Sequence, residues 1–411
     1  MNRLFTVRIF CTTILVIGFT AWASAAASAR HVVTNNDNFP NENTITIYAA
    51  SGTADAAKLT ELTTLSTGGV GDGDGYLEGQ QQAFVLVGKT KCLFIGDAGS
   101  ADVAAIDVGT RRLVGNFRGS FQKDLSNQFG ISLLPSSDGT LLYAAYRERA
   151  FGFASSIATF TIEAGCKLTF VDDTIGFGSQ GGGIEGMAAH GDILVVGYGD
   201  GSIESFHISG TTLTSNNDKQ NATGFTSHNN GLGPGSVQIT ADGRFAVFGD
   251  VVSNIEGEFT EIEVSDISSG KLTATVDYGG AHHANGDLGP GLSSNSAILS
   301  SDESHIYVSN PFSGQVTALN FDAANGVVTF GCISDPLSGF TNAFPAMGQI
   351  AASGATAKGD VLWVAEDGNG GSSSIGIVRF VPEGSSCSLT ESAHSPAEDA
   401  HSIILKSLSA F

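Results

Sequence analysis

The sequence is poor in positive charge and in charged residues generally. Among its 411 residues, 19 are Lys or Arg and 41 are Asp or Glu, so the formal net charge is −22 at pH 7, and charged residues make up only 15% of the chain. Binding to nucleic acid or to an anionic membrane surface requires clustered Lys and Arg. The composition therefore excludes nucleic acid as a partner.

No apolar run in the sequence reaches the roughly 20 residues that a helix needs to cross a bilayer. The longest run, residues 9–22, follows Arg3 and Arg8 and precedes a tract of small residues that ends at Ala29. This order of segments is typical of a cleaved secretory signal peptide. We expect residues 1–29 to be removed and the mature protein, without a transmembrane segment, to be secreted or periplasmic.

Several catalytic signatures are also missing. The sequence has no GxSxG elbow, no HExxH helix motif and no P-loop. It has no CxxC motif and no Cys/His cluster of the kind that binds zinc. We therefore expect no metal and no cofactor, and the order of residues identifies no catalytic nucleophile with its base.

What the chain does contain is glycine, 54 residues, together with 41% hydrophobic residues, a balance typical of a sheet protein with many tight turns. The stretch 294–332 shows the pattern most clearly, because turn-rich SSDES, NPFSG and DAANG separate four short apolar segments. These segments predict strands at Ser296–Leu299, His305–Ser309, Gln315–Phe321 and Val327–Thr329. Together they form one antiparallel meander.

The second strand of this meander, with Ile306, Tyr307 and Val308 in sequence, has no polar face and suits a strand covered on both sides. A single sheet of four strands cannot cover both of its own faces, so copies of the sheet are expected to stack around an axis. Equivalent second strands recur every 49 to 62 residues, which gives seven units in one domain, residues 30–411. The residues in the same register are Val32, Phe94, Tyr143, Val195, Val247, Tyr307 and Trp363.

The two ends of the mature chain predict how the ring closes. The mature chain enters at a second-strand motif, HVVTNN, and ends with an additional strand at Ser402–Leu408. Pairing the last strand with the first unit removes two exposed sheet edges. We predict an all-β fold, a seven-bladed β-propeller of four-stranded antiparallel blades closed by the C-terminal strand, with eight blades or an open solenoid as alternatives.

The mature chain has four cysteines, an even number that favours two disulfides in an exported protein. Cys92 begins a second strand, and Cys166 begins the fourth strand of the following unit. These places predict the pair Cys92–Cys166, which leaves Cys332–Cys387 as the remaining pair, with four buried free thiols as the alternative.

The VVTNN and YVSN strand starts, the SSDG and TADGR turns before such strands and the xVxxxDxxxG pattern after them resemble the YVTN-type repeats of the lactonase-like seven-bladed propellers. That family includes 6-phosphogluconolactonase and carboxymuconate-cyclising enzymes. The resemblance extends over the mature chain and implies the propeller fold. Its motifs specify blades, so they imply little about chemistry.

Propeller strands alternate in direction, so the connections between blades share a face with the turns between second and third strands. In this chain the connections between blades are long and polar, and ligand sites favour such loops. The same face receives the second-strand ends, which carry Asp97, Glu148, Asp200, Asp250, Asn310 and Asp367. We expect any functional site to lie there.

A duplicated loop, HNNGLGPG at 228–235 and HANGDLGPG at 283–291, is the most specific signal on this face. It offers hydrogen-bonding and titratable groups on adjacent blades, from His228, Asn230, His283, Asn285 and Asp287. A second interpretation is structural, because Asn, Gly and Pro also form turns and His can cap loop carbonyls.

Two other loop segments carry charge. Arg147, Glu148 and Arg149 could clamp an anionic ligand or form a surface ion-pair set. GDGDG at 71–75 resembles the start of a calcium loop but lacks the later carboxylates of an EF-hand, which favours a solvent loop.

The resemblance implies a His and Arg residues in the family's GPRH and SNR motifs, but this chain has GPGS and SNP, with Gly235, Ser236 and Pro311 at those positions. Such residues cannot replace cationic recognition or proton transfer. We therefore expect a monomeric scaffold that binds a small molecule or an extracytoplasmic protein, and we lean against an enzyme. The alternative is a divergent hydrolase or isomerase acting on a lactone or sugar-derived acid through His228, His283 and Asp287.

Overall fold

The computed structural model describes most of the chain after residue 30. The described residues are 31–52, 56–71, 82–119, 128–148, 155–177, 183–221, 234–250, 261–279, 296–310, 313–339, 347–356, 359–366, 373–383, 386–401 and 407–410.

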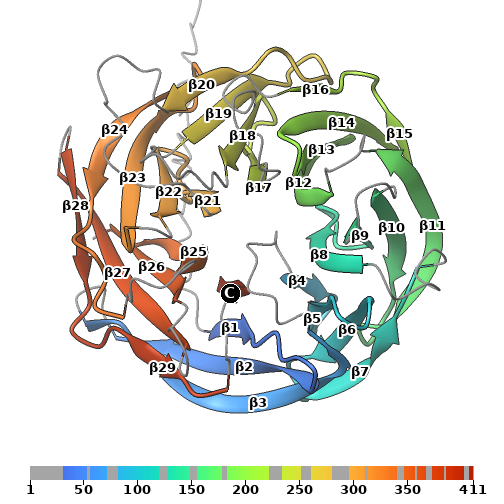
Figure 1. The fold of residues 1–411 in the computed structure, drawn as a ribbon, viewed down its shortest axis with the longest axis horizontal. Coiled ribbons are helices and arrows are strands. Elements are labelled where there is room, and N and C mark those ends of the chain that lie inside the picture. The colour runs from blue at the N-terminus through green and yellow to red at the C-terminus, as the bar shows by residue number, and fades with distance from the viewer. Residues whose placement is uncertain are drawn as a thin grey trace, which may run out of the picture.

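Seven antiparallel sheets are arranged in a ring (Figure 1), which confirms the predicted seven-bladed β-propeller. From the ring axis outwards, blade 1 contains β30 (Ser407–Ala410), β1 (His31–Asn35), β2 (Glu42–Ser51) and β3 (Lys58–Val70). Blade 2 contains β4 (Gln82–Val87), β5 (Thr90–Asp97), β6 (Asp102–Asp107) and β7 (Arg112–Phe117). Blade 3 contains β8 (Gln128–Pro135), β9 (Leu141–Glu148), β10 (Ser155–Ile162) and β11 (Leu168–Phe177).

The remaining blades repeat this order, and two of them have a fifth strand. Blade 4 contains β12 (Ile184–His190), β13 (Ile193–Tyr198), β14 (Ser202–Ser209) and β15 (Thr212–Ser215), with β16 (Gln220–Asn221) also on β14. Blade 5 contains β17 (Pro234–Ile239), β18 (Phe245–Asp250), β19 (Glu261–Asp266) and β20 (Val276–Gly279). Blade 6 contains β21 (Ser296–Leu299), β22 (His305–Asn310), β23 (Gln315–Asp322) and β24 (Val327–Ile333). Blade 7 contains β25 (Met347–Thr356), β26 (Gly359–Glu366), β27 (Ser373–Glu383) and β28 (Ser386–Glu391), with β29 (Ala397–Asp399) also on β27.

The apolar second strands hold the ring together because their two faces pack against different neighbours. In β22, Tyr307 packs in the cluster shared with blade 7, whereas Ile306 and Val308 pack in the cluster shared with blade 5. All three side chains are fully buried. Seven such apolar clusters fill the seven joints between blades. Full burial of each large apolar side chain contributes about 1.5–3 kcal/mol.

The first blade departs from the predicted register by one residue. Val33 packs against Leu93 and Ile95 of the next blade, whereas Val32 faces the preceding blade, blade 7, beside Trp363. In the other blades it is the register residue, such as Phe94 or Tyr307, that packs against the next blade. The expected equivalence of Val32 with those residues is therefore wrong. Adjacent valines in HVVTN have no polar neighbour to set the alternation, so the sequence pattern could not choose between them.

Pairing of β30 with β1 closes the ring as predicted, with Val32 opposite Ala410 and Asn35 opposite Ser407. The chain end lies at the inner edge of β1 in Figure 1. Leu408 of β30 is buried in the cluster between blades 7 and 1. The described strand runs to Ala410 rather than ending at Leu408 as predicted, and residues 402–406 of the predicted strand lie outside the described residues.

Both predicted disulfides are present, and each links neighbouring blades. Cys92 bonds to Cys166 between blades 2 and 3, with their Cα atoms 5.3 Å apart. Cys332 bonds to Cys387 between blades 6 and 7, with their Cα atoms 5.5 Å apart. Such links stabilise a fold by about 2–4 kcal/mol each.

Within the described residues there is no helix long and apolar enough to span a membrane.

Removing the closing strand tests this architecture. We expect deletion of residues 402–411 to expose the edge of β1 and the apolar surface that Leu408 covers, giving insoluble protein or a strongly lowered melting temperature. Deletion of Phe411 alone is the matched control and should leave the melting temperature unchanged. A soluble 402–411 deletion variant with the wild-type melting temperature would contradict the closure.

Candidate functional site

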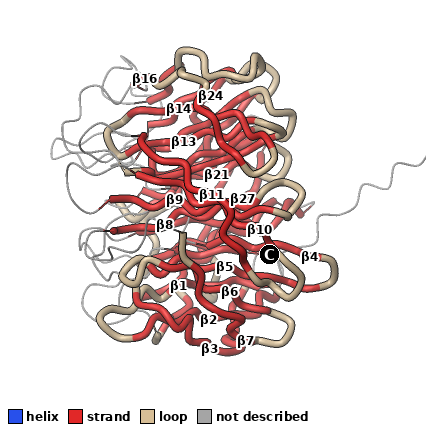
Figure 2. The backbone as a smooth tube through the Cα atoms, turned by 90° about the vertical axis from the view of Figure 1, so that its right-hand side faces the viewer, coloured by secondary structure: helices blue, strands red, loops and turns tan. Residues whose placement is uncertain are grey.

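The two faces of the ring carry different connections. One face, which we call the loop-bearing face, has the connections between blades and the turns from second to third strands. The opposite, hairpin-turn face has the turns from first to second and from third to fourth strands, such as that between β4 and β5, which lie on the right in Figure 2.

The residues of the duplicated loop, His228, Asn230, His283, Asn285 and Asp287, lie outside the described residues. Their positions in the chain fall in the connections from β16 to β17 and from β20 to β21, which belong to the loop-bearing face. Residues 72–75 of the GDGDG segment, Arg149, Pro311 and Asp367 also lie outside the described residues.

Three other predicted site residues are described only by their backbone. Arg147 and Glu148 end β9, the second strand of blade 3, where Glu148 lies opposite Gln128. Asp250 ends β18 in blade 5 and lies opposite Pro234 of the inner strand. Their place at second-strand ends agrees with the prediction, but blade 4 separates Arg147 and Glu148 of blade 3 from Asp250 of blade 5.

Asp97, which ends β5, is completely buried between blades 1 and 2 rather than open to the loop-bearing face. Its Oδ1 accepts hydrogen bonds from Asn43 Nδ2 at 2.7 Å and from Thr67 Oγ1 at 2.9 Å. Burial raises the pKa of Asp97 to about 8, and the nearby carboxylate of Asp102 contributes to the increase. Asp97 is therefore mostly protonated at neutral pH.

Glu366, which ends β26, is the corresponding residue of blade 7, because it follows Trp363 as Asp97 follows Phe94. It is completely buried, and its Oε2 accepts a hydrogen bond from Ser374 Oγ at 2.7 Å. Burial raises the pKa of Glu366 to about 7 against the hydrogen bond from Ser374. Glu366 was not among the predicted site residues, although aligning VLWVAE with CLFIGD places it at the position of Asp97.

Tyr198 of blade 4 occupies the same place and also turns towards the preceding blade. Its hydroxyl donates to Glu204 Oε2 at 2.9 Å, and burial raises its pKa. Polar groups at these second-strand ends are thus packed into the joints beneath the loop-bearing face. Asp97, Glu366 and Tyr198 are buried and are not themselves open to a ligand.

Two cations on the loop-bearing face whose side chains the structure describes, Arg118 and Lys219, are each paired with a carboxylate. Arg118 Nη2 lies 3.0 Å from Asp102 Oδ2. Lys219 Nζ lies 3.9 Å from Asp200 Oδ2 and 4.5 Å from the centre of the Tyr198 ring. Neither cation is free to bind an anionic ligand.

The position at which the family resemblance implies a histidine is structural in this chain. Ser236 of β17 is buried, and its Oγ accepts a hydrogen bond of 2.9 Å from the backbone N–H of Ala297 in blade 6. Ser132 makes the corresponding bond in blade 3, donating to the carbonyl oxygen of Glu185 at 2.7 Å. The hydroxyl at this position therefore joins neighbouring inner strands.

Among the described residues, no group of three or more His, Cys, Asp or Glu side chains could hold a metal ion.

The ring of seven four-stranded blades, with polar connections gathered on one face, defines the class of protein. The profile of the family described as "Lactonase, 7-bladed beta-propeller" matches residues 132–398, which cover most of blades 3 to 7. The chain belongs to this lactonase family.

Solved structures agree with this fold. The periplasmic gluconolactonase PpgL of Pseudomonas aeruginosa has a TM-score of 0.52 at 16% identity, over 73% of this chain and 80% of that chain. A candidate 6-phosphogluconolactonase from Bacteroides uniformis has a TM-score of 0.55 at 11% identity, over 74% of this chain and 84% of that chain. A protein of unknown function from Desulfotomaculum acetoxidans has a TM-score of 0.55 at 12% identity, over 89% of this chain and 99% of that chain. At these identities the likeness shows the fold alone, and no curated protein matches the chain.

The buried carboxyl group of Glu366 predicts a pH dependence of stability. Its folded-state pKa of about 7 lies above its ordinary value of 4.5, so the folded protein binds more protons than the unfolded chain in this window. The free energy of unfolding should therefore fall as pH rises from about 4.5 to 7. Glu366→Gln cannot lose a proton, and chemical denaturation should show it losing roughly 1–3 kcal/mol less than wild type over this window.

The exposed Glu383, at the other end of the same blade, supplies the control. Glu383→Gln should keep the wild-type pH dependence. Identical pH slopes for wild type and Glu366→Gln would show that Glu366 is ionised in the folded protein and would refute the assignment.

Proposed function

We propose that this protein is a hydrolase or isomerase that acts on a lactone or a sugar-derived acid at its loop-bearing face. The observation that carries the proposal is the lactonase-family match over residues 132–398. The structure of PpgL, a periplasmic gluconolactonase, supports the same substrate class at the level of the fold.

Within this class we favour an unphosphorylated lactone. Recognition of a phosphate group uses Arg or Lys, often in a bidentate arrangement. On the described part of the loop-bearing face, Arg118 and Lys219 are paired with Asp102 and Asp200, and the whole chain carries a net charge of −22. An uncharged ring requires no such cation and avoids repulsion by this negative field.

His228 and His283 are the groups that we assign to proton transfer, and Asp287 follows His283 by four residues in the sequence. In hydrolysis, the oxygen of a water molecule attacks the lactone carbonyl carbon while a neutral imidazole accepts the proton of that water. The bond from the carbonyl carbon to the ring oxygen then breaks, and the imidazolium returns the proton to the leaving oxygen. Histidine suits both steps because its ordinary pKa lies near neutral pH.

Export to an oxidising compartment is part of the proposal. The Arg3 and Arg8 leader followed by residues 9–22 supports it, since this is the pattern of a signal peptide. The two disulfides, Cys92–Cys166 and Cys332–Cys387, also support it, because such bonds persist outside the cytoplasm.

A binding scaffold without catalysis is the second candidate, and one observation favours it. Ser236 stands where the family resemblance implies a histidine, and its hydroxyl is already engaged with the backbone of Ala297. A protein with serine in place of this histidine would still bind the sugar acid but would not catalyse its reaction.

An assay with D-glucono-1,5-lactone separates the two candidates. We expect wild type to hydrolyse it above the spontaneous rate and to prefer it to the 6-phosphorylated lactone. Replacing both His228 and His283 by Ala should lower kcat by about 100-fold or more, because general acid–base catalysis contributes on this scale. His207→Ala, an exposed histidine near the hairpin-turn face, is the matched control and should keep full activity.

Each other outcome is informative. Absence of turnover, together with gluconate binding that the double variant weakens, would reject the enzyme and establish the scaffold. Turnover that persists in the double variant would show that the histidine assignment is wrong, and Arg147 and Glu148 would be replaced next.

A further inference from the structure

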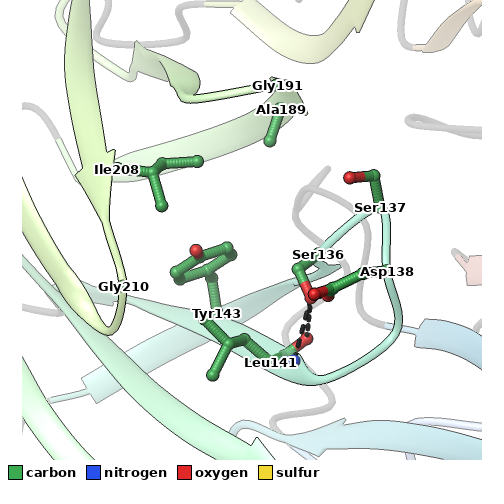
Figure 3. Close-up of a pocket in the computed structure, with 9 residues that line it drawn as sticks. All are labelled: Ser136, Ser137, Asp138, Leu141, Tyr143, Ala189, Gly191, Ile208 and Gly210. Carbon is green, nitrogen blue, oxygen red and sulfur yellow. Dashed lines mark hydrogen bonds between the residues drawn. The ribbon is translucent and has the colours of Figure 1, made fainter.

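A small cavity of about 130 Å³ lies between blades 3 and 4 on the hairpin-turn face, away from the proposed active site (Figure 3). Its walls are the β8–β9 turn with Ser136 and Asp138, and the turns of blade 4 at Gly191 and Gly210. Tyr143 lies at its base, between Ile208 and the β8–β9 turn. We call this cavity the blade 3–4 notch. Its volume exceeds the roughly 10–15 Å³ that a single water needs.

The hydroxyl of Tyr143 makes no hydrogen bond to any described residue, although the side chain is completely buried. Leaving a buried polar group unsatisfied is costly, and such groups are rare in folded proteins. Burial also raises the pKa of this phenol, so it keeps its proton and can donate it in a hydrogen bond. Although Ser136 and Asp138 also line the notch, neither accepts a hydrogen bond from this hydroxyl.

The equivalent tyrosine of another blade does have a hydrogen-bond acceptor. Tyr307 occupies in blade 6 the place that Tyr143 occupies in blade 3, and its hydroxyl donates to Asp360 Oδ2 of the next blade at 2.6 Å. The residue of blade 4 that corresponds to Asp360 is Asp192, three positions before the register residue Val195. Its side chain is 76% exposed, and its Oδ2 lies 3.5 Å from His207 Nδ1. Asp192 therefore does not accept a hydrogen bond from Tyr143.

The repeat also shows what normally fills this space. Leu141 corresponds to Phe245 in blade 5 and His305 in blade 6, because each ends the same type of turn. Both rings reach the next blade, Phe245 against Gly326 and His305 at 4.6 Å from the ring of Phe380. Leu141 has no ring.

On the opposite wall of the notch, Gly191 and Gly210 have open space where a side chain would begin. The notch therefore has room for a ring that Leu141 does not supply, next to a tyrosine hydroxyl that has no acceptor.

We propose that the blade 3–4 notch binds a small, neutral, ring-shaped organic molecule whose carbonyl or hydroxyl oxygen accepts a hydrogen bond from Tyr143. The ring occupies the space that Phe245 and His305 fill in other blades, packing against Leu141 and Ile208. Anions are disfavoured, because hydrogen bonds from Ser136 and Thr140 lower the pKa of Asp138 and keep that wall negatively charged. The site is separate from the loop-bearing face and does not depend on the proposed lactonase activity.

2-Piperidone is a suitable probe, since it is a neutral six-membered ring with one carbonyl and does not hydrolyse readily. Saturation-transfer NMR on the full chain should show binding in the millimolar range, as expected for so few atoms. Cyclohexanecarboxylate, an anion with the same ring size, should bind more weakly. Tyr143→Phe should weaken binding of 2-piperidone about fivefold by removing one hydrogen bond, and Ala189→Leu should abolish it by filling the notch.

Tyr307→Phe is the matched control, because it removes the equivalent hydroxyl from a joint that is already filled. This variant, checked for folding by circular dichroism, should bind 2-piperidone like wild type. No binding to wild type, or equal affinity of Tyr143→Phe and wild type, would overturn the proposal. Loss of binding in His228→Ala/His283→Ala would place the probe at the loop-bearing face and would overturn it as well.

Discussion

Sideways packing of each blade's second strand against two neighbours is the interaction on which the rest of this structure depends. Tyr307 faces blade 7 while Ile306 and Val308 face blade 5, and the same division recurs around the ring. Because every sheet covers the apolar face of the next, none can be stable alone, and the last joint must be closed by β30 on β1. The disulfides reinforce two joints without defining the ring.

The ends of these strands show a second consequence of the same packing. Residues that finish a second strand turn into a joint rather than towards solvent, so Asp97 and Glu366 become buried carboxyl groups with raised pKa values. Asn43, Thr67 and Ser374 satisfy part of their hydrogen-bonding capacity. The blade 3–4 notch is the opposite case, a joint in which Leu141 and Asp192 leave a ring and an acceptor missing.

Much of the architecture could be predicted from the sequence because the repeat contains it. Runs such as HIYVSN without a polar face, and a surplus strand at the C-terminus, were enough to predict the blades, their number and the closure. The cysteine pairs followed from the places of Cys92 and Cys166 in neighbouring units. The register of HVVTN was wrong because two adjacent valines fit either face. The burial of Asp97 was missed because a sequence shows where a strand ends and not which way its last side chain turns. The blade 3–4 notch depends on Leu141 being smaller than Phe245 in a three-dimensional neighbourhood that the sequence pattern does not contain.

We propose that the chemistry of lactones or sugar acids takes place on the loop-bearing face, above the packed joints between blades. A crystal structure of the protein soaked with gluconate, the product of the proposed hydrolysis, tests this claim most directly. We expect electron density for gluconate between the loops that contain His228 and His283. Gluconate bound only on the hairpin-turn face, with the loop-bearing face empty at saturating concentration, would contradict it.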